Sequence, residues 1–207
     1  MERLKASNRI LRILYERRLE DFKERLEELK NPRIIYVSDL VACSHKRFFR
    51  MNYPELTLRF EPVTLMGELL HVGLEEILKD RGYSVEVSFE RDVTVNEELY
   101  TLKGRVDAIG EGRVVEIKTG RPGQILPHPH HVLQLQVYLQ LLDVPQGILV
   151  YITPDRITEY NVEREEINIE ELAKETIEDT KHPRWEWECR YCYYSKMCPF
   201  RVEQHKV

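Results

Sequence analysis

Three residues on two neighbouring stretches of this chain have the types and spacing of a cation site beside a proton carrier. Glu116 and Lys118 lie two residues apart in a predicted strand, so their side chains project from the same face. Asp107 lies on the preceding predicted strand, and a tight turn around Gly110–Gly112 joins the two. Two carboxylates and a lysine held together can bind a hard divalent cation and suit metal-assisted hydrolysis of a phosphodiester. The alternative from these residues alone is a surface hairpin with an ordinary cross-strand salt bridge.

Two predicted helices carry further polar pairs. Gly67 and His71 are one turn apart, and a glycine at this place permits close approach by another element. Gln134 and Tyr138 are also one turn apart and share a helix face. Taken alone, His71 is typical of a hydrogen-bonded structural histidine and the second pair of an ordinary helix surface. The four motifs follow one another along the chain, and their ordered set is far more specific than any single one.

These residues require elements that bring them together, and the apolar periodicity indicates which. The expected helices cover residues 2–30, 38–51, 64–80, 130–142 and 169–180, and the expected strands cover residues 84–95, 100–109, 113–119, 147–153 and 157–162. This order predicts an α/β (mixed α+β) fold with a central mixed sheet flanked by helices. We expect an N-terminal amphipathic helix over residues 1–33 and one domain over residues 34–207. The apolar stripe of that helix, which includes Leu11, Tyr15 and Leu29, is expected to pack on the body of the protein.

Composition limits the class of protein. The chain has 207 residues, 42% of them hydrophobic and 32% charged, and a net charge of -5, which argues against a general nucleic-acid coat protein. It does not exclude a local basic groove. Lys46, Arg47 and Arg50 are expected to share a helix face, as a phosphate-contacting patch or as an ordinary solvated face. Further candidates for a DNA path are Arg59, Arg121 and Lys196.

The four cysteines form an uneven set. The chain has no apolar run long enough to span a membrane and no secretory signal pattern, so we expect a cytoplasmic protein with no membrane partner. In that compartment the cysteines are metal ligands or reactive thiols rather than disulfides. Cys189, Cys192 and Cys198 form a compact triplet, and Cys43 is the only candidate for a fourth ligand. Such a site can hold zinc or an iron–sulfur cluster, and free thiols are the third possibility.

The ordered motifs resemble the RecB-like branch of the PD-(D/E)XK nuclease superfamily, over roughly residues 38–200. The resemblance implies a restriction-endonuclease-like core in which His71, Asp107, Glu116 and the backbone carbonyl of Ile117 hold Mg²⁺ or Mn²⁺. It also implies that Lys118 orients or deprotonates the attacking water. Gln134 and Tyr138 would position Lys118 and the DNA strand. One departure is visible, because Val106 stands where the motif has proline.

The one-plus-three cysteine pattern, with no helicase segment, resembles the CRISPR-associated RecB-like exonuclease family. The resemblance implies a 4Fe-4S cluster on Cys43, Cys189, Cys192 and Cys198 that joins an N-terminal helix to the tail, with the aromatic residues of the tail shielding it. It further implies a single-strand-directed DNA exonuclease, able also to cut internally, that processes DNA ends for a CRISPR integrase during spacer acquisition. The alternatives are a stand-alone DNA-repair nuclease of the same fold and a non-catalytic DNA-binding assembly subunit.

Overall fold

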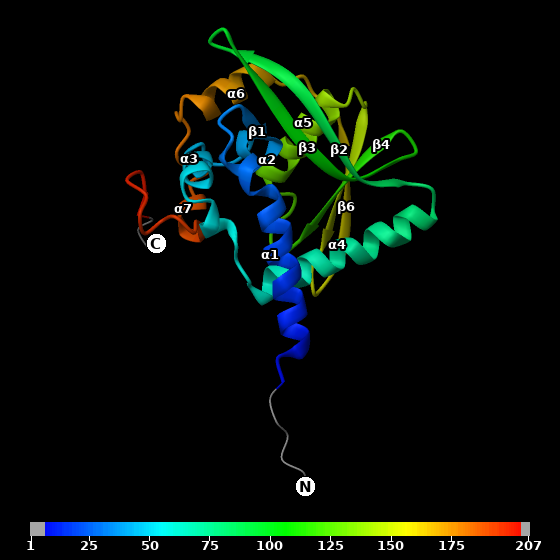
Figure 1. Ribbon diagram of the computed structural model, residues 1–207. Helices are drawn as coiled ribbons and strands as arrows, with labels where there is room; N and C mark the ends of the chain where they lie inside the picture. Colours follow the sequence, from blue (N-terminus) through cyan, green and yellow to red (C-terminus); the bar gives the residue numbers. More distant parts are fainter. Residues whose placement is uncertain (1–6, 204–207) are drawn as a thin grey trace.

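The computed structural model describes residues 7–203, and in them a mixed sheet of six strands carries helices on both faces (Figure 1). The helices are α1 (Arg9–Lys30), α2 (Val37–Leu40), α3 (His45–Asn52), the 3-10 helix η1 (Pro54–Thr57), α4 (Pro62–Asp80), α5 (Pro129–Leu141), α6 (Ile169–Ile177) and α7 (Glu188–Tyr191). The strands are β1 (Ile34–Tyr36), β2 (Ser84–Val95), β3 (Glu98–Gly110), β4 (Arg113–Thr119), β5 (Gln146–Ile152) and β6 (Ile157–Glu163). The predicted fold class is confirmed. None of the described helices is long and apolar enough to cross a membrane.

The sheet is open at one place, and this opening matters for the site. The strand order is β1-β3-β4-β5-β6, with β2 paired to β3. Strands β4 and β5 are parallel and joined through α5, whereas β3 and β4 are antiparallel. The β3–β4 pairing covers only residues 108–110 and 113–115. Beyond it the two strands no longer pair, which leaves a gap in the sheet beside Asp107 and Glu116.

Each face of the sheet has its own apolar core. On one face, α2, α5 and α6 cover a core that includes Leu135 and Leu149. On the other face, α4 packs on a smaller cluster that contains Val115 and Ile117. Because side chains alternate along a strand, Glu116 and Lys118 then point to the face that α5 covers. The strand pattern predicted from the sequence is therefore confirmed for β4.

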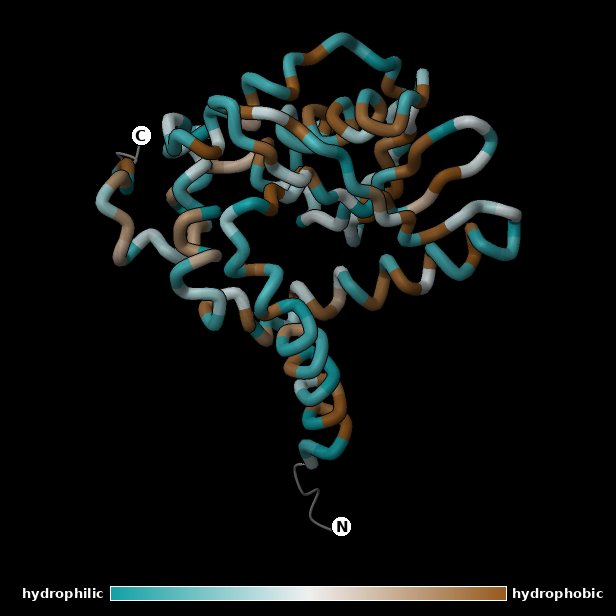
Figure 2. Tube along the Cα trace, turned by 45° about the horizontal axis from the view of Figure 1, so that its top comes forward, coloured by the Kyte–Doolittle hydropathy of each residue, from teal (hydrophilic) through white to brown (hydrophobic). Residues whose placement is uncertain are grey.

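The first helix only partly follows the prediction. Residues 2–6 of the expected helix lie outside the described part of the chain. Of the predicted apolar stripe, Leu29 is buried at the C-terminal end of α1, whereas Leu11 and Tyr15 are exposed. Figures 1 and 2 show the reason, because the N-terminal part of α1 projects away from the sheet. The expectation that the whole stripe packs on the body of the protein is wrong for the outer turns.

The helix predicted over residues 38–51 is two helices. The backbone N–H of Tyr36 donates to the Asp39 carboxylate at 3.0 Å and caps α2, which begins at Val37, one residue earlier than predicted. The chain then breaks at residues 41–44, and α3 starts at His45. In this break the backbone N–H of Cys43 donates to Glu188 at 2.9 Å. The interruption therefore turns Cys43 toward the C-terminal segment.

Candidate active site

The side chain of Lys118 connects β4 with α5. Its ammonium nitrogen lies 2.6 Å from Oε1 of Glu116 and 2.9 Å from Oε1 of Gln134. The Nε2 group of Gln134 in turn donates to the hydroxyl of Tyr138 at 3.1 Å. Two pairs that the sequence places on different elements thus form one hydrogen-bonded chain. Desolvation raises the pKa of the buried Tyr138 hydroxyl, which therefore stays protonated.

Asp107 fills the opening between β3 and β4. Its Oδ2 accepts from the backbone N–H of Ile117 at 2.6 Å, in place of the missing strand partner. The N–H and C=O of one strand residue point toward the same neighbouring strand, so the Ile117 carbonyl faces the same opening. The other oxygen, Oδ1, lies 3.4 Å from Nδ1 of His71. The structure thus brings His71, Asp107 and the Ile117 backbone together.

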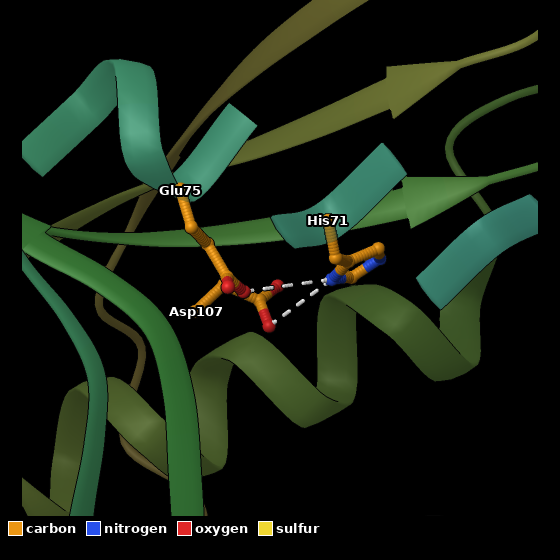
Figure 3. A group of neighbouring side chains, drawn as sticks. All are labelled: His71, Glu75 and Asp107. Carbon is orange, nitrogen blue, oxygen red and sulfur yellow. Dashed lines mark ion pairs between the residues drawn. The ribbon is translucent and has the colours of Figure 1, made fainter. Parts of the chain in front are cut away.

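Glu75 joins this group, although the sequence did not single it out as a site residue. It follows His71 by one turn of α4, and its Oε1 lies 3.9 Å from Nδ1 of that histidine. Figure 3 shows the side chains of His71 and Glu75 on α4 converging with Asp107 of β3. One ligand atom from each of the three lies within 4.8 Å of the other two, as in a metal site. The four-residue spacing between His71 and Glu75 was the only sequence signal for this contact. Such spacing is too common on helices to single out a site residue.

Glu116 lies beside this group, and its buried surroundings disfavour the ionised form of its side chain. Only 3% of the residue is exposed, and Oε2 is buried without a hydrogen-bond partner among residues 7–203. Burial raises the pKa of Glu116 to about 7, an effect that Lys118 opposes and Asp107 reinforces. The hydrogen bond to Asp107 raises the pKa of His71, and burial raises that of Glu75. A buried Glu116 oxygen without a partner, close to the charge of Asp107, fits a divalent cation that would neutralise both carboxylates.

Gly67 sets the distance between α4 and the sheet. A Cβ at this position would lie 2.9 Å from the hydroxyl oxygen of Thr119, the last residue of β4. The close approach expected at this glycine is confirmed. Since His71 is one turn further along α4, the same contact determines how far the histidine reaches toward Asp107 and Glu116.

The four cysteines line one small pocket, whose cavity volume is only about 10 Å³. Within the described chain, no three of their sulfur atoms lie within 4.8 Å of one another. Thiolates on a single zinc ion would be about 3.8 Å apart, because Zn–S bonds of about 2.3 Å point to the corners of a tetrahedron. The four thiols are therefore not arranged as the ligands of a single zinc ion. Burial raises the pKa of Cys43 to about 11, so ligand binding there requires release of a proton.

Glu188 holds the tail against the start of α3. It is 2% exposed, and its Oε1 accepts from the Cys43 backbone and from Lys46 at 2.9 and 2.7 Å. Its Oε2 accepts from the backbone N–H groups of Arg184 and Trp185, each at 3.1 Å. Sequence reasoning missed this residue, because a glutamate between aromatic residues carries no recognisable spacing. The carboxylate organises the segment on both sides of Cys43 and Cys189.

The basic face predicted on α3 is wrong for two of its three members. Arg47 and Arg50 are 7% and 8% exposed. The Arg47 guanidinium donates to the carbonyl of Pro32, and that of Arg50 donates to the carbonyl of Leu29 and to Asp39. These arginines attach α3 to the end of α1 and are not free to contact phosphate. Lys46 is turned instead toward Glu188, as described above.

The aromatic residues of the tail, which were expected to shield the cysteines from water, differ widely in exposure. Tyr194 is 5% exposed and stacks on Phe49, with ring centroids 4.6 Å apart. In contrast, Trp187, Tyr191, Tyr193 and Phe200 are all exposed. Burial in the core therefore explains only some of the aromatic residues in the tail.

Comparison with known proteins identifies the family. The model of the PD-(D/E)XK nuclease superfamily matches residues 9–199. The CRISPR-associated exonuclease Cas4 of Saccharolobus solfataricus (strain ATCC 35092 / DSM 1617 / JCM 11322 / P2) is 41% identical over 203 residues, which cover 93% of this chain and 99% of the relative. The chain belongs to the PD-(D/E)XK nuclease superfamily and, within it, to the family of this Cas4 exonuclease. It is therefore a nuclease of the metal-dependent type.

One solved structure has the same fold over nearly the whole chain. The crystal structure of SSO0001 superposes with a TM-score of 0.87 at 39% identity, and the match covers 94% of this chain and 98% of that one. An alkaline exonuclease from Laribacter hongkongensis is more distant, with 17% identity, a TM-score of 0.49 and coverage of 74% and 90%. In the Cas4-family chain described here, Asp107 and the Glu116-x-Lys118 pair have the residue types of the motif from which the superfamily takes its name.

Proposed function

We propose that the chain is a Mg²⁺- or Mn²⁺-dependent deoxyribonuclease whose cation site lies in the opening between β3 and β4. The observation that supports this most directly is the buried, partnerless Oε2 of Glu116 beside the Lys118–Gln134 hydrogen bond. A buried oxygen without a partner costs free energy, which an ordinary salt bridge does not recover. A bound cation would supply the missing partner. The ordinary salt-bridge interpretation of Glu116 and Lys118 is therefore disfavoured.

The ligands we propose come from three elements, namely α4, β3 and β4. His71 and Asp107 would hold the ion together with Glu116 and the carbonyl of Ile117, and Glu75 would support it from α4. A histidine in a carboxylate set favours Mn²⁺ over Mg²⁺. When bound, such an ion polarises the scissile phosphate and lowers the pKa of water.

Lys118 would act on the reacting atoms from the other side. An ammonium group has three N–H donors, and two of them are used by Glu116 and Gln134. The third is left for the attacking water or for a phosphate oxygen on which charge develops. Gln134 and Tyr138 would act through Lys118 as positioning residues, because their hydrogen bonds fix the direction of the ammonium group.

We further propose a 4Fe-4S cluster on Cys43, Cys189, Cys192 and Cys198. The four cysteines line one pocket, and their sulfur atoms are not gathered as closely as the ligands of a single zinc ion would be, which favours a cluster. Its role would be structural, since it would tie the start of α3 to the C-terminal segment. Reduced cysteine ligands suit a cytoplasmic location.

The biological role proposed for the chain follows its Cas4 relative. The name of that relative supports a CRISPR-associated exonuclease. We further propose, from the family resemblance, that the chain trims DNA ends, acting on single strands and cutting internally as well, before a CRISPR integrase inserts them. Residues 34–207 would form the nuclease domain with its cluster segments. Residues 1–33 would form an N-terminal appendage, which the exposed outer turns of α1 support.

The test is cleavage of labelled single- and double-stranded DNA with and without Mn²⁺, on anaerobically purified protein of recorded visible absorbance. We expect metal-dependent cutting that is lost in Lys118→Ala. Lys79→Ala is the matched control, because Lys79 lies on the exposed surface of α4 and forms only a local ion pair with Glu76. Folded, brown wild-type protein that cuts no DNA would contradict the proposal and favour an assembly subunit instead.

A further inference from the structure

Four exposed residues next to the cysteine segment form a surface of aromatic rings and arginines. Trp187 and Tyr191 are 39% and 53% exposed, and their ring centroids are 6.4 Å apart. The guanidinium carbons of Arg121 and Arg190 lie 6.0 and 5.5 Å from the centre of the Tyr191 ring. We call Arg121, Trp187, Arg190 and Tyr191 the aromatic–arginine surface.

This surface begins at the candidate active site. Arg121 follows Lys118 by three residues, so their Cα atoms are at most about 11 Å apart. On the other side, the ring of Trp187 lies 4.7 Å from that of His130 in the first turn of α5. His130 precedes Gln134 by one turn of the same helix. Both ends of the surface therefore lie beside the residues that hold Lys118.

The available rings and charges decide which ligand fits. Tyr193 is excluded, because Arg59 lies 3.6 Å over its ring and is itself paired with Glu61 at 2.7 Å. Arg121 and Arg190 form no ion pair with a carboxylate of residues 7–203, so both guanidinium groups are available to an anion. Exposed rings beside unpaired arginines suit a ligand with flat apolar faces and regularly spaced negative charges.

We propose that the aromatic–arginine surface binds single-stranded DNA as it enters or leaves the active site. Unpaired bases would stack on Trp187 and Tyr191, and the adjoining phosphates would contact Arg121 and Arg190. In a duplex the base faces are covered by their neighbours, so the same surface discriminates against double strands. The inference rests on the proposed nuclease function, to which it adds the means of selecting the strand.

Binding is tested separately from cleavage, with a labelled oligodeoxythymidylate and an equal-length duplex in the presence of EDTA. By fluorescence anisotropy, Tyr191→Ala and Arg121→Gln are each expected to bind the single strand roughly tenfold more weakly, with little change for the duplex. Tyr191→Phe keeps the ring and is expected to bind like wild type. Tyr15→Ala is the matched control, since Tyr15 is 45% exposed on α1 and no arginine lies over its ring.

A second readout reports stacking directly. Binding of the oligonucleotide should quench the fluorescence of exposed Trp187, and Trp187→Phe should lose that quenching while retaining most of the affinity. Trp185, the other tryptophan, should give an unchanged background signal. Its indole N–H donates to the carbonyl of Val41 at 2.8 Å, which holds the ring in place.

The outcomes separate the two proposals. Wild-type affinity in both Tyr191→Ala and Arg121→Gln, or equal losses for single strand and duplex, would overturn the inference about this surface. Arg121 lies outside the cysteine segment, so its variant remains informative if Tyr191→Ala loses visible absorbance. Strand-selective binding by a protein that cuts nothing would preserve the surface and contradict the nuclease proposal alone.

Discussion

Replacing Gln134 by leucine tests whether the hydrogen-bonded chain from β4 to α5 positions Lys118 for catalysis. The variant removes an acceptor 2.9 Å from the Lys118 ammonium and leaves the Tyr138 hydroxyl, 3.1 Å away, without its donor. A hydrogen bond to a charged group contributes about 1.5–3 kcal/mol. Lys118 keeps its contact with Glu116, so we expect part of this to be lost, and kcat to fall roughly 10- to 100-fold with KM little changed.

Stability separates positioning from simple damage. Tyr138 is 4% exposed, and its orphaned hydroxyl should cost about 1–3 kcal/mol in the free energy of unfolding. Adding Tyr138→Phe to Gln134→Leu removes that hydroxyl, so the double variant should recover stability but not kcat. The assay is single-turnover cleavage at saturating Mn²⁺, with thermal unfolding measured in parallel. An unchanged rate in Gln134→Leu, or recovery of rate together with stability, would refute the reasoning.

Four further changes have defined outcomes. Glu75→Gln should weaken Mn²⁺ binding roughly tenfold by calorimetry without lowering the melting temperature, because the carboxylate supports the site from α4. Glu188→Gln should destabilise the protein by about 3–5 kcal/mol and lower the visible absorbance per chain. The substitution removes the buried negative charge that forms an ion pair with Lys46. Burial lowers the pKa of His130 to about 4, so the neutral imidazole contributes stability above pH 6.5 that is lost as the pH falls toward 4. His130→Gln should therefore reduce the loss of unfolding free energy at pH 5 by about 1 kcal/mol. Leu135→Ala, in the α5 core beside Gly147, should cost about 2–5 kcal/mol in urea unfolding, and a smaller loss would mean that the core collapses around the site.

Sequence reasoning succeeded where the relevant physics is local. Alternation along a strand put Glu116 and Lys118 on one face, and their nitrogen–oxygen distance of 2.6 Å agrees. Helical spacing put Gln134 and Tyr138 one turn apart, and they are hydrogen-bonded. The strand boundaries of β2 and β4 were also predicted correctly, because apolar alternation and turn glycines lie within a few residues of each boundary.

It failed where the environment of a side chain depends on distant parts of the chain. Basic residues at helical spacing on α3 suggest a phosphate patch, yet Arg47 and Arg50 satisfy carbonyl groups of residues 29 and 32. Only the packing of α3 against the end of α1 decides between solvent and burial. The same holds for the tail, where residue type predicts apolar shielding but Tyr191 remains exposed.

The sequence by itself determined the fold class, the family and the order of the site residues, since these depend on residue type and on spacing within single elements. Tertiary structure decided which of those residues meet. It ended the β3–β4 pairing beside Asp107, brought Glu75 to His71, and placed Arg121 beside Tyr191, 70 residues further along the chain. Contacts of that range follow from how helices and sheet pack together, and no periodicity within one segment encodes them.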